Sequence, residues 1–214
     1  MYQPEPETLY CFGRAWECAY IGVMLRIEHG LPPSMRQAAA ELYWEAFGAK
    51  LGKLLGPAPR GVAFFAQTVH PPSVLAALDG DDLLGIAAFQ TDGTGFSQAG
   101  IADLFRHYGI GALWRLVPLA MLERSAPGDS LQMDGICVRA DARGKGVGAA
   151  LFQALFAHAR AQGYAHITLD VIDSNPRARA LYERLGFVAR GTESTSFLQP
   201  LLGFSAATRM RLTL

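Results

Sequence analysis

The sequence predicts an α/β or α+β domain built around a mixed sheet. Stretches with helical periodicity alternate along the chain with short apolar stretches that favour strands. In the second half of the chain, two expected helices have distinctive starts. One follows a glycine-rich loop with basic residues, and the other starts at an Asn-Pro pair. With 214 residues, half of them hydrophobic, the chain is long enough to bury a large core.

Composition excludes several classes of function. Nineteen basic residues balance nineteen acidic ones, which argues against a nucleic-acid-binding protein because such proteins carry a basic excess. The three cysteines and five histidines have no disulfide or metal-ligand spacing, so we expect no metal. The N-terminus lacks a basic signal segment, and the most apolar stretch, 110–122, is too short to span a membrane. We therefore expect a cytoplasmic protein without membrane or nucleic-acid partners.

The expected elements follow in chain order. Residues 1–18, which start rich in Pro and Glu, are expected to form an N-terminal tail or extension, and residues 19–214 a single domain. Strands are expected at 21–28, on both sides of the Asp79–Asp82 turn, and at 130–138, 166–173, 187–194 and 206–214. Helices are expected from Ser34 to Gly52 or Gly56, over 99–124 with breaks at 109–111 and Pro118, from the 142–148 loop to Gln162, and from Asn175 to before Gly186. The pattern of residues 61–70 fits a helix or a strand.

The stretch "ARGKGVGAAL", residues 142–151, predicts an anion-binding loop. The five amides from Gly144 to Gly148 would lie at a helix N-terminus, where unpaired N–H groups and the helix dipole favour an anion. Arg143 and Lys145 add positive charge beside them. The spacing matches neither a Walker A loop nor a dinucleotide G-x-G-x-x-G motif. Taken alone, the stretch also fits a tight turn between a strand and a helix.

The stretch "DVIDSNPRARALYERLGF", residues 170–187, predicts a second helix with a polar start. Asn175 is a good N-cap, and Pro176 suits the first helical position. Asn175, Arg179, Tyr182 and Gly186 follow one another at spacings of four, three and four, which places them on one face. The core-facing stripe is expected at Ala178, Leu181 and Leu185. A tyrosine packed against the core with its hydroxyl in water is the plain structural interpretation of Tyr182.

Together the two stretches resemble the motifs of the GNAT superfamily, the acyl-CoA-dependent N-acyltransferases. The pattern R-x-x-G-x-G, with Arg143, Gly146 and Gly148, resembles the pyrophosphate-binding signature, and residues 170–187 resemble the second motif in the expected order. The resemblance covers about 131–187 and implies a mixed, mostly antiparallel sheet, splayed between its fourth and fifth strands and flanked by helices. It also implies acetyl-CoA as co-substrate.

The resemblance assigns roles to particular residues. Tyr182 takes the position of the general acid that protonates the leaving thiolate. Cofactor binding falls to Ile136, Cys137 and Val138 through their main chain, to Arg143, Gly144, Lys145, Gly146, Val147 and Gly148 in the loop, and to Asn175 and Arg179 in the following helix. Gly135, in the middle of the cofactor-binding strand, would allow a bulge that splays this strand from the next.

The acceptor amine must lose a proton before it attacks. A lysine-like amine costs about 4.6 kcal/mol to be neutral at pH 7 and an α-amino group about 1.4 kcal/mol, so only the first strongly requires a base. Asp134, four residues before Val138, is the leading candidate, and a hydrogen-bonded strand acid is the equal alternative. Weaker candidates are Glu28, Glu41, Glu45 and Glu193.

The expected function is transfer of an acetyl group from acetyl-CoA to a primary amine of a small molecule, amino acid or peptide. A non-catalytic acyl-CoA-binding or regulatory domain stays open, whereas a nucleotide-dependent oxidoreductase lacks its motif. The acids of the helix from Ser34, Glu41 and Glu45, would suit a cationic acceptor. An insertion at about 92–129 departs from the family pattern, and a lid, an extension of the core and a homodimer contact are its alternatives.

Overall fold

A nine-stranded mixed sheet forms the centre of the protein. The computed structural model describes residues 10–12, 15–20, 23–91, 93–120, 128–194, 196 and 199–214. The strands run in the order β1-β2-β3-β4-β5-β6-β7-β9-β8, and one neighbouring pair, β6 and β7, is parallel. They are β1 (Tyr10–Phe12), β2 (Ala15–Tyr20), β3 (Val23–His29), β4 (Val74–Asp79), β5 (Asp82–Phe89), β6 (Ser130–Val138), β7 (His166–Ile172), β8 (Val188–Ser194) and β9 (Ala206–Thr213).

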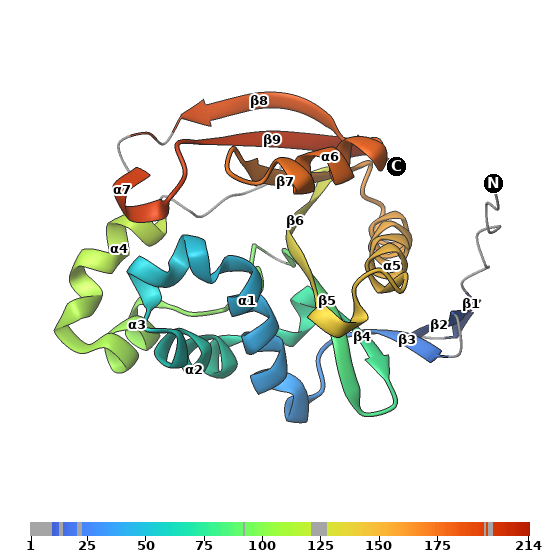
Figure 1. The fold of residues 1–214 in the computed structure, drawn as a ribbon, viewed down its shortest axis with the longest axis horizontal. Helices are drawn as coiled ribbons and strands as arrows, with labels where there is room; N and C mark the ends of the chain where they lie inside the picture. The colour runs from blue at the N-terminus through green and yellow to red at the C-terminus, as the bar shows by residue number, and fades with distance from the viewer. Residues whose placement is uncertain are drawn as a thin grey trace.

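Helices cover both faces of this sheet (Figure 1). They are α1 (Arg36–Leu55), α2 (Ala58–Thr68), α3 (Ile101–Tyr108), α4 (Ala112–Ala120), α5 (Val147–Ala161), α6 (Pro176–Arg184) and α7 (Gln199–Leu202). Short 3-10 turns are η1 (Pro33–Met35), η2 (Pro71–Ser73), η3 (Gly109–Gly111) and η4 (Ala140–Ala142). In β4, Val74 and Ala76 belong to the core beneath α1 and α2, whereas Leu75 belongs to the core beneath α5. Because side chains alternate along a strand, the two cores lie on opposite faces.

Most of the predicted elements are confirmed. The hairpin around Asp79–Asp82 joins β4 to β5, and β6 occupies the expected residues 130–138. Residues 61–70, left undecided by their pattern, belong mainly to the helix α2. Helix α5 ends before Gly163, whose φ of +79° is the left-handed conformation of a C-terminal cap.

Two expectations differ from the structure. The expected tail, residues 1–18, contains β1 and part of β2, because aromatic residues in this stretch favour strands and pair onto the edge of the sheet at β3. Pro118 does not break the insertion helix and lies inside α4, where it removes one backbone donor. Residues 121–127, including Arg124, lie outside the described residues.

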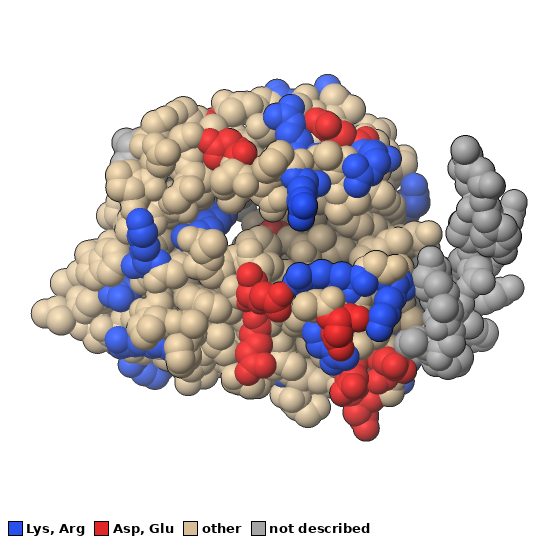
Figure 2. All heavy atoms as spheres, viewed as in Figure 1, with Lys and Arg blue, Asp and Glu red and all other residues tan. Residues whose placement is uncertain are grey.

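The sheet opens between β6 and β7, the fourth and fifth of the strands predicted from the sequence. Strand β6 pairs with β7 only over Ser130–Gln132, whereas β7 continues along β9 as far as Ile172. Beyond Gln132 the two strands diverge, and the molecule is hollowed at the centre of this face (Figures 1 and 2). The predicted splayed, mostly antiparallel sheet is confirmed.

A β-bulge at Asp134 marks the point where β6 leaves β7. The register with β5 steps from Ala88 opposite Gly135 to Phe89 opposite Met133, so Asp134 is the extra residue. Before the bulge, Met133 faces the core beneath α5. After it, Cys137 faces the core beneath α1. The bulge therefore changes which face of the sheet each following residue reaches.

Helix α1 packs closely onto this bulge. A Cβ atom on Gly135 would lie 2.2 Å from Cζ of Phe47, so the aromatic ring occupies the space that any other residue at 135 needs. Phe47 in turn packs against Tyr43, with ring centroids 4.6 Å apart. Glycine at 135 is required for this close approach between helix and strand.

We expect Gly135→Ala to lower the free energy of unfolding by about 1 to 3 kcal/mol, because the new methyl group forces the Phe47 ring out of place. The matched control is Gly52→Ala in α1, where a Cβ meets nothing within 4 Å. There alanine should raise the free energy of unfolding by about 0.5 to 1 kcal/mol. Urea denaturation measures both, and equal stability of Gly135→Ala and the wild type would contradict the packing argument.

Candidate active site

The glycine-rich loop connects η4 to α5 and exposes backbone donors. Gly144 and Gly146 have φ values of +76° and +82°, which favour glycine over any residue with a side chain. Gly146 is the N-cap of α5, and its carbonyl accepts the N–H of Ala150 at 3.0 Å. The N–H of Arg143 donates to the carbonyl of Ala140 at 3.4 Å, whereas the N–H groups of residues 144–149 have no backbone acceptor among the described residues. The expected row of free amides, Gly144 to Gly148, is therefore present at a helix N-terminus.

Arg143 connects the loop to the two elements beside it. Its Nε donates to the carbonyl of Val138 at 2.9 Å, and its Nη2 lies 2.5 Å from Oε1 of Glu45 in α1. The guanidinium stays more than half exposed. Glu45 is paired with Arg143 in this structure, and its expected role toward a cationic acceptor stays a prediction. Lys145 is exposed in the same turn.

The end of β6 presents main-chain groups to the gap between β6 and β7. Arg139 donates its N–H to Leu84 in β5 at 2.8 Å, and in an antiparallel pair the residues alternate in the direction of these groups. It follows that Ile136 and Val138 direct their N–H groups away from β5, toward the gap. Cys137 directs its own toward Ile86 of β5, so its predicted main-chain contact with a ligand stays a prediction that this pairing does not support.

The start of α6 lies across the gap. The Asn175 side chain accepts the N–H of Ala178 at 3.1 Å, which confirms the N-cap. This bond uses Oδ1 and leaves the amide Nδ2 available. Arg179 is exposed and pairs with Glu183 at 3.0 Å, one helical turn further on.

Tyr182 is half-buried, and its ring packs against the core beneath α5. The ring centroids of Phe152 and Phe187 lie 6.2 Å and 5.8 Å away. Tyr182 therefore lies on the apolar side of α6, whereas the sequence analysis expected it on the face of Asn175 and Arg179. The spacing of three from Arg179 places Tyr182 at the border between that polar face and the core-facing stripe. Its hydroxyl makes no hydrogen bond to another described residue, and burial, with a smaller effect of Cys137, raises the pKa of Tyr182 to about 12.

The thiol of Cys137, on β6, faces the core beneath α1. It is free and buried, and burial, assisted by Glu45 and opposed by Arg143, raises the pKa of the Cys137 thiol to about 12. A negative charge on this sulfur would disfavour charge on the phenols of Tyr182 and Tyr43, and it is a smaller cause of their raised pKa values than burial is. Phenols from α6 and α1 therefore both lie near it. The sequence analysis had used only the main chain of Cys137.

Aromatic rings from α1 and the insertion lie beside this thiol. Tyr43 stacks on Phe96 with ring centroids 4.0 Å apart and planes 5° from parallel. Burial, followed by the charges of Asp134 and Cys137, raises the pKa of Tyr43 well above its ordinary value. Trp44, the next residue of α1, packs over Gly61 of α2, where a Cβ would lie 1.9 Å from its ring.

Asp134 holds the first part of the insertion. Its Oδ2 accepts the backbone N–H of Phe96 at 2.9 Å, whereas Oδ1 has only the weak contact of the Gln90 amide at 3.5 Å. Burial raises the pKa of Asp134, and the bond from Phe96, the contact of Gln90 and the charge of Lys50 offset part of that rise. The remaining acids Glu28, Glu41 and Glu193 lie on β3, α1 and β8.

The comparison with protein families decides the identity of this fold. The model of the Acetyltransferase (GNAT) family matches residues 36–187, about 71% of the 214 residues. The chain belongs to the GNAT acetyltransferase family. The match includes the glycine-rich loop, the gap and the start of α6.

Relatives and solved structures agree with this membership. Streptothricin acetyltransferase from Streptomyces lavendulae is 31% identical over 107 residues, which are 50% of this chain and 57% of that relative. The GNAT domain of S. lividans PAT superposes with a TM-score of 0.58 at 14% identity, over 96% of this chain and 99% of that one. A GCN5-related N-acetyltransferase from Kribbella flavida gives 0.57 at 22% identity, over 89% and 98%. At these identities the two structures show the GNAT fold alone.

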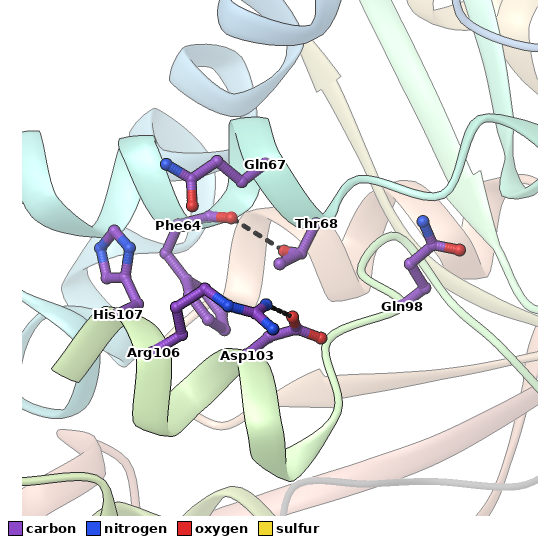
Figure 3. A pocket seen from close by; sticks show the side chains of 7 residues that line it. All are labelled: Phe64, Gln67, Thr68, Gln98, Asp103, Arg106 and His107. Carbon is purple, nitrogen blue, oxygen red and sulfur yellow. Dashed lines mark hydrogen bonds and ion pairs between the residues drawn. The ribbon is translucent and has the colours of Figure 1, made fainter. Parts of the chain in front are cut away.

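A separate cavity of about 550 Å³ lies between α2 and α3, away from the GNAT motifs (Figure 3). Its wall is formed by Phe64, Gln67, Thr68, Gln98, Asp103, Arg106 and His107, and contains none of the predicted site residues. Within the described part of the chain, no three His, Cys, Asp or Glu side chains are grouped closely enough to bind a metal ion. The described helices also include none that is long and apolar enough to cross a membrane.

We expect Asp134→Asn to raise the free energy of unfolding near pH 7. A carboxyl with a raised pKa binds its proton more tightly in the folded state than in the unfolded state. Its ionisation therefore lowers the free energy of unfolding above the folded pKa and has no effect below the unfolded pKa of about 3.9. The gain should therefore disappear as the pH falls toward about 3.9. Urea denaturation across this range measures it.

Asp141→Asn is the matched control for this experiment. A hydrogen bond from Arg139 lowers the pKa of exposed Asp141, so its substitution should give no gain near pH 7. Equal responses of the two variants would contradict the argument from burial.

Proposed function

We propose that this protein transfers an acetyl group from acetyl-CoA to a primary amine by direct attack of the amine on the thioester. The observation that supports it best is the gap between β6 and β7. Two strand N–H groups that have no strand partner among the described residues line it, the glycine-rich loop precedes α5 on the β6 side, and Tyr182 belongs to α6, which follows β7. This combination fits a long, bent ligand with an anionic end and a reactive carbonyl.

The loop would hold the pyrophosphate of coenzyme A. The amides from Gly144 to Gly148, Val147 among them, belong to the loop and first turn at the N-terminus of α5, where the helix dipole favours an anion, and Arg143 and Lys145 supply positive charge beside them. Across the gap, the free Nδ2 of Asn175 and the exposed guanidinium of Arg179 would contact the cofactor. Their roles rest on the family resemblance and on this exposure.

Ile136 and Val138 would bind the pantetheine arm and polarise the acyl carbonyl. Their N–H groups point into the gap, where water is partly excluded and a hydrogen bond to a developing oxyanion is strong. The amine nitrogen forms a bond to the carbonyl carbon, and the carbon–sulfur bond then breaks. The sulfur leaves with the electron pair and takes up a proton.

Tyr182 would donate that proton. Efficient transfer needs donor and acceptor of similar pKa, and burial raises the pKa of Tyr182 to about 12. Burial likewise raises the pKa of the Cys137 thiol to about 12. Desolvation would also raise the pKa of the coenzyme A thiol that leaves in this region, so the pKa values of the Tyr182 phenol and of the leaving thiol would stay similar.

Asp134 would remove the proton from the acceptor. A raised pKa brings a carboxylate closer to the pH at which a base works, and Oδ1 is only weakly engaged while Oδ2 is anchored. The Asp134→Asn variant decides between base and anchor: a base requires the acidic limb of the kcat/KM profile to disappear, and an unchanged limb rejects it.

The acceptor we propose is a small molecule, amino acid or peptide that carries a primary amine. The match to a streptothricin acetyltransferase supports an amine-bearing small molecule, and the rings of Tyr43 and Phe47 beside Asp134 would suit an ammonium group approaching over an aromatic surface.

We expect thiol release from acetyl-CoA when the protein is mixed with a panel of primary amines, read by a thiol-reactive dye together with detection of the acetylated amine. The control is the same panel with tertiary amines, which have no N–H to lose. Tight acetyl-CoA binding without thiol release across the panel would favour the alternative, a non-catalytic acyl-CoA-binding domain.

We expect Tyr182→Phe to keep acetyl-CoA affinity and to slow turnover by about 10² to 10⁴-fold, because the ring still packs and only the proton donor is lost. Single-turnover kinetics measures the chemical step directly. Tyr164→Phe, at a tyrosine partly buried against the same core, is the matched control and should leave the rate unchanged. Wild-type single-turnover rates in Tyr182→Phe would reject the assignment.

A further inference from the structure

The insertion exposes a group of large apolar side chains, which we call the insertion patch. It consists of Ile101, Phe105, Ile110, Leu113, Trp114 and Val117. Among the described residues, one other large hydrophobic side chain, Val188, is comparably exposed, and it lies on β8. The patch is therefore a local property of the insertion.

Geometry makes these side chains neighbours. Ile101 and Phe105 are one turn apart on α3, Leu113 and Val117 are one turn apart on α4, and Ile110 lies on the 3-10 turn η3 that joins the two helices. Helices α3 and α4 contact each other. They form a projecting end of the molecule, whose tip is uncharged on the face shown (Figures 1 and 2).

The opposite side of the insertion is firmly held by the core. Leu104, Tyr108 and Ala112 are buried, and Tyr108 donates its hydroxyl to the carbonyl of Leu55 at 2.7 Å. Arg115 donates Nε to the carbonyl of Leu54 at 2.5 Å. The helices that carry the insertion patch are therefore fixed to the core, and the patch is exposed in the folded protein.

The exposed area matches the apolar centre of a protein interface. The exposed fractions of the six side chains add up to about three and a half fully exposed residues. At roughly 150 to 250 Å² for each residue, their exposed area is on the order of 600 Å². A stable interface buries about 800 Å² on each partner, of which about 60% is apolar. A patch of about 600 Å² is at the upper end of what monomers expose, and patches of this size are often functional.

The charges around the patch indicate an uncharged partner. Among the described residues of the insertion, Asp103 pairs with Arg106, and Arg115 is held by main-chain carbonyls and by the rings of Tyr108 and Trp114. Residues 93–120 contain no lysine, whereas helices that lie on membranes carry a row of basic residues on their polar face. A nucleic acid would require the same positive charge.

We propose that the insertion patch binds the insertion patch of a second copy of this chain, forming a two-fold symmetric dimer. The same patch on a second copy is neutral, apolar and of equal size, so the two surfaces are complementary. In a two-fold symmetric dimer both patches are buried against each other, and neither stays exposed. The proposal is independent of acetyl transfer, because the patch shares no residue with the gap between β6 and β7.

Sedimentation of the full chain at about 0.5 to 100 µM tests the proposal, with masses expected to rise from 23.1 kDa to twice that value. Leu113→Asp should raise the dimer dissociation constant at least ~100-fold, because it buries an unpaired charge. Val188→Asp is the matched control, since Val188 and Leu113 are 56% and 57% exposed. It should leave the dissociation constant unchanged, and circular dichroism checks that both variants fold.

Several results would overturn the proposal. They are a wild-type chain that stays monomeric over the whole range, a dimer that Leu113→Asp leaves intact, and equal weakening by both variants. Co-sedimentation of a monomeric wild type with phosphatidylcholine vesicles, lost in Leu113→Asp, would assign the patch to a lipid surface. Dimerisation lost in Leu113→Asp alone supports the two-fold contact.

Discussion

The contact between the Phe47 ring and the bulged strand at Gly135 is the constraint on which the site depends. One extra residue, Asp134, changes the facing of β6 halfway along its length, so that Cys137 faces α1 while Ile136 and Val138 pack toward α5. Only glycine at 135 lets α1 approach this closely. The same local irregularity coincides with the loss of pairing to β7. Strand geometry, helix packing and the opening of the sheet are therefore parts of a single arrangement.

Burial gives this region its electrostatic character. Desolvation is the largest cause of the raised pKa values of Asp134, Cys137, Tyr43 and Tyr182. An environment that disfavours charge on all of them keeps phenols protonated and makes a carboxylate more basic. It would also increase the effect of any N–H group directed at a developing oxyanion. These properties suit acyl transfer to an amine better than simple storage of an acyl-CoA.

The insertion serves the fold on one side and leaves the other side unpartnered. Phe96 stacks on Tyr43 and is fixed by Asp134, so the start of the insertion forms part of the surroundings of the site. Further on, Tyr108 and Arg115 secure the segment to the end of α1. Among the exposed side chains of α3 and α4, Trp114 takes part in this anchoring through its ring, which lies against the Arg115 guanidinium. Of the three alternatives drawn from the sequence, extension of the core fits the described contacts, and the outer face is where a second copy would bind.

The sequence by itself determined the elements and the glycine-rich loop at the start of α5, because both depend on local chemistry. Glycine spacing, the Asn175 cap and apolar periodicity act over a few residues, so the order of strands and helices and the ends of β6 and α6 could be predicted. Tertiary structure alone decided how distant groups share space. It assigned Glu45 to Arg143, Trp44 to the α2 interface, Tyr182 to the core and the Cys137 main chain to β5. Each of these four contacts joins residues that are far apart in the chain. Local sequence patterns extend over a few residues and do not indicate which distant residue becomes the partner.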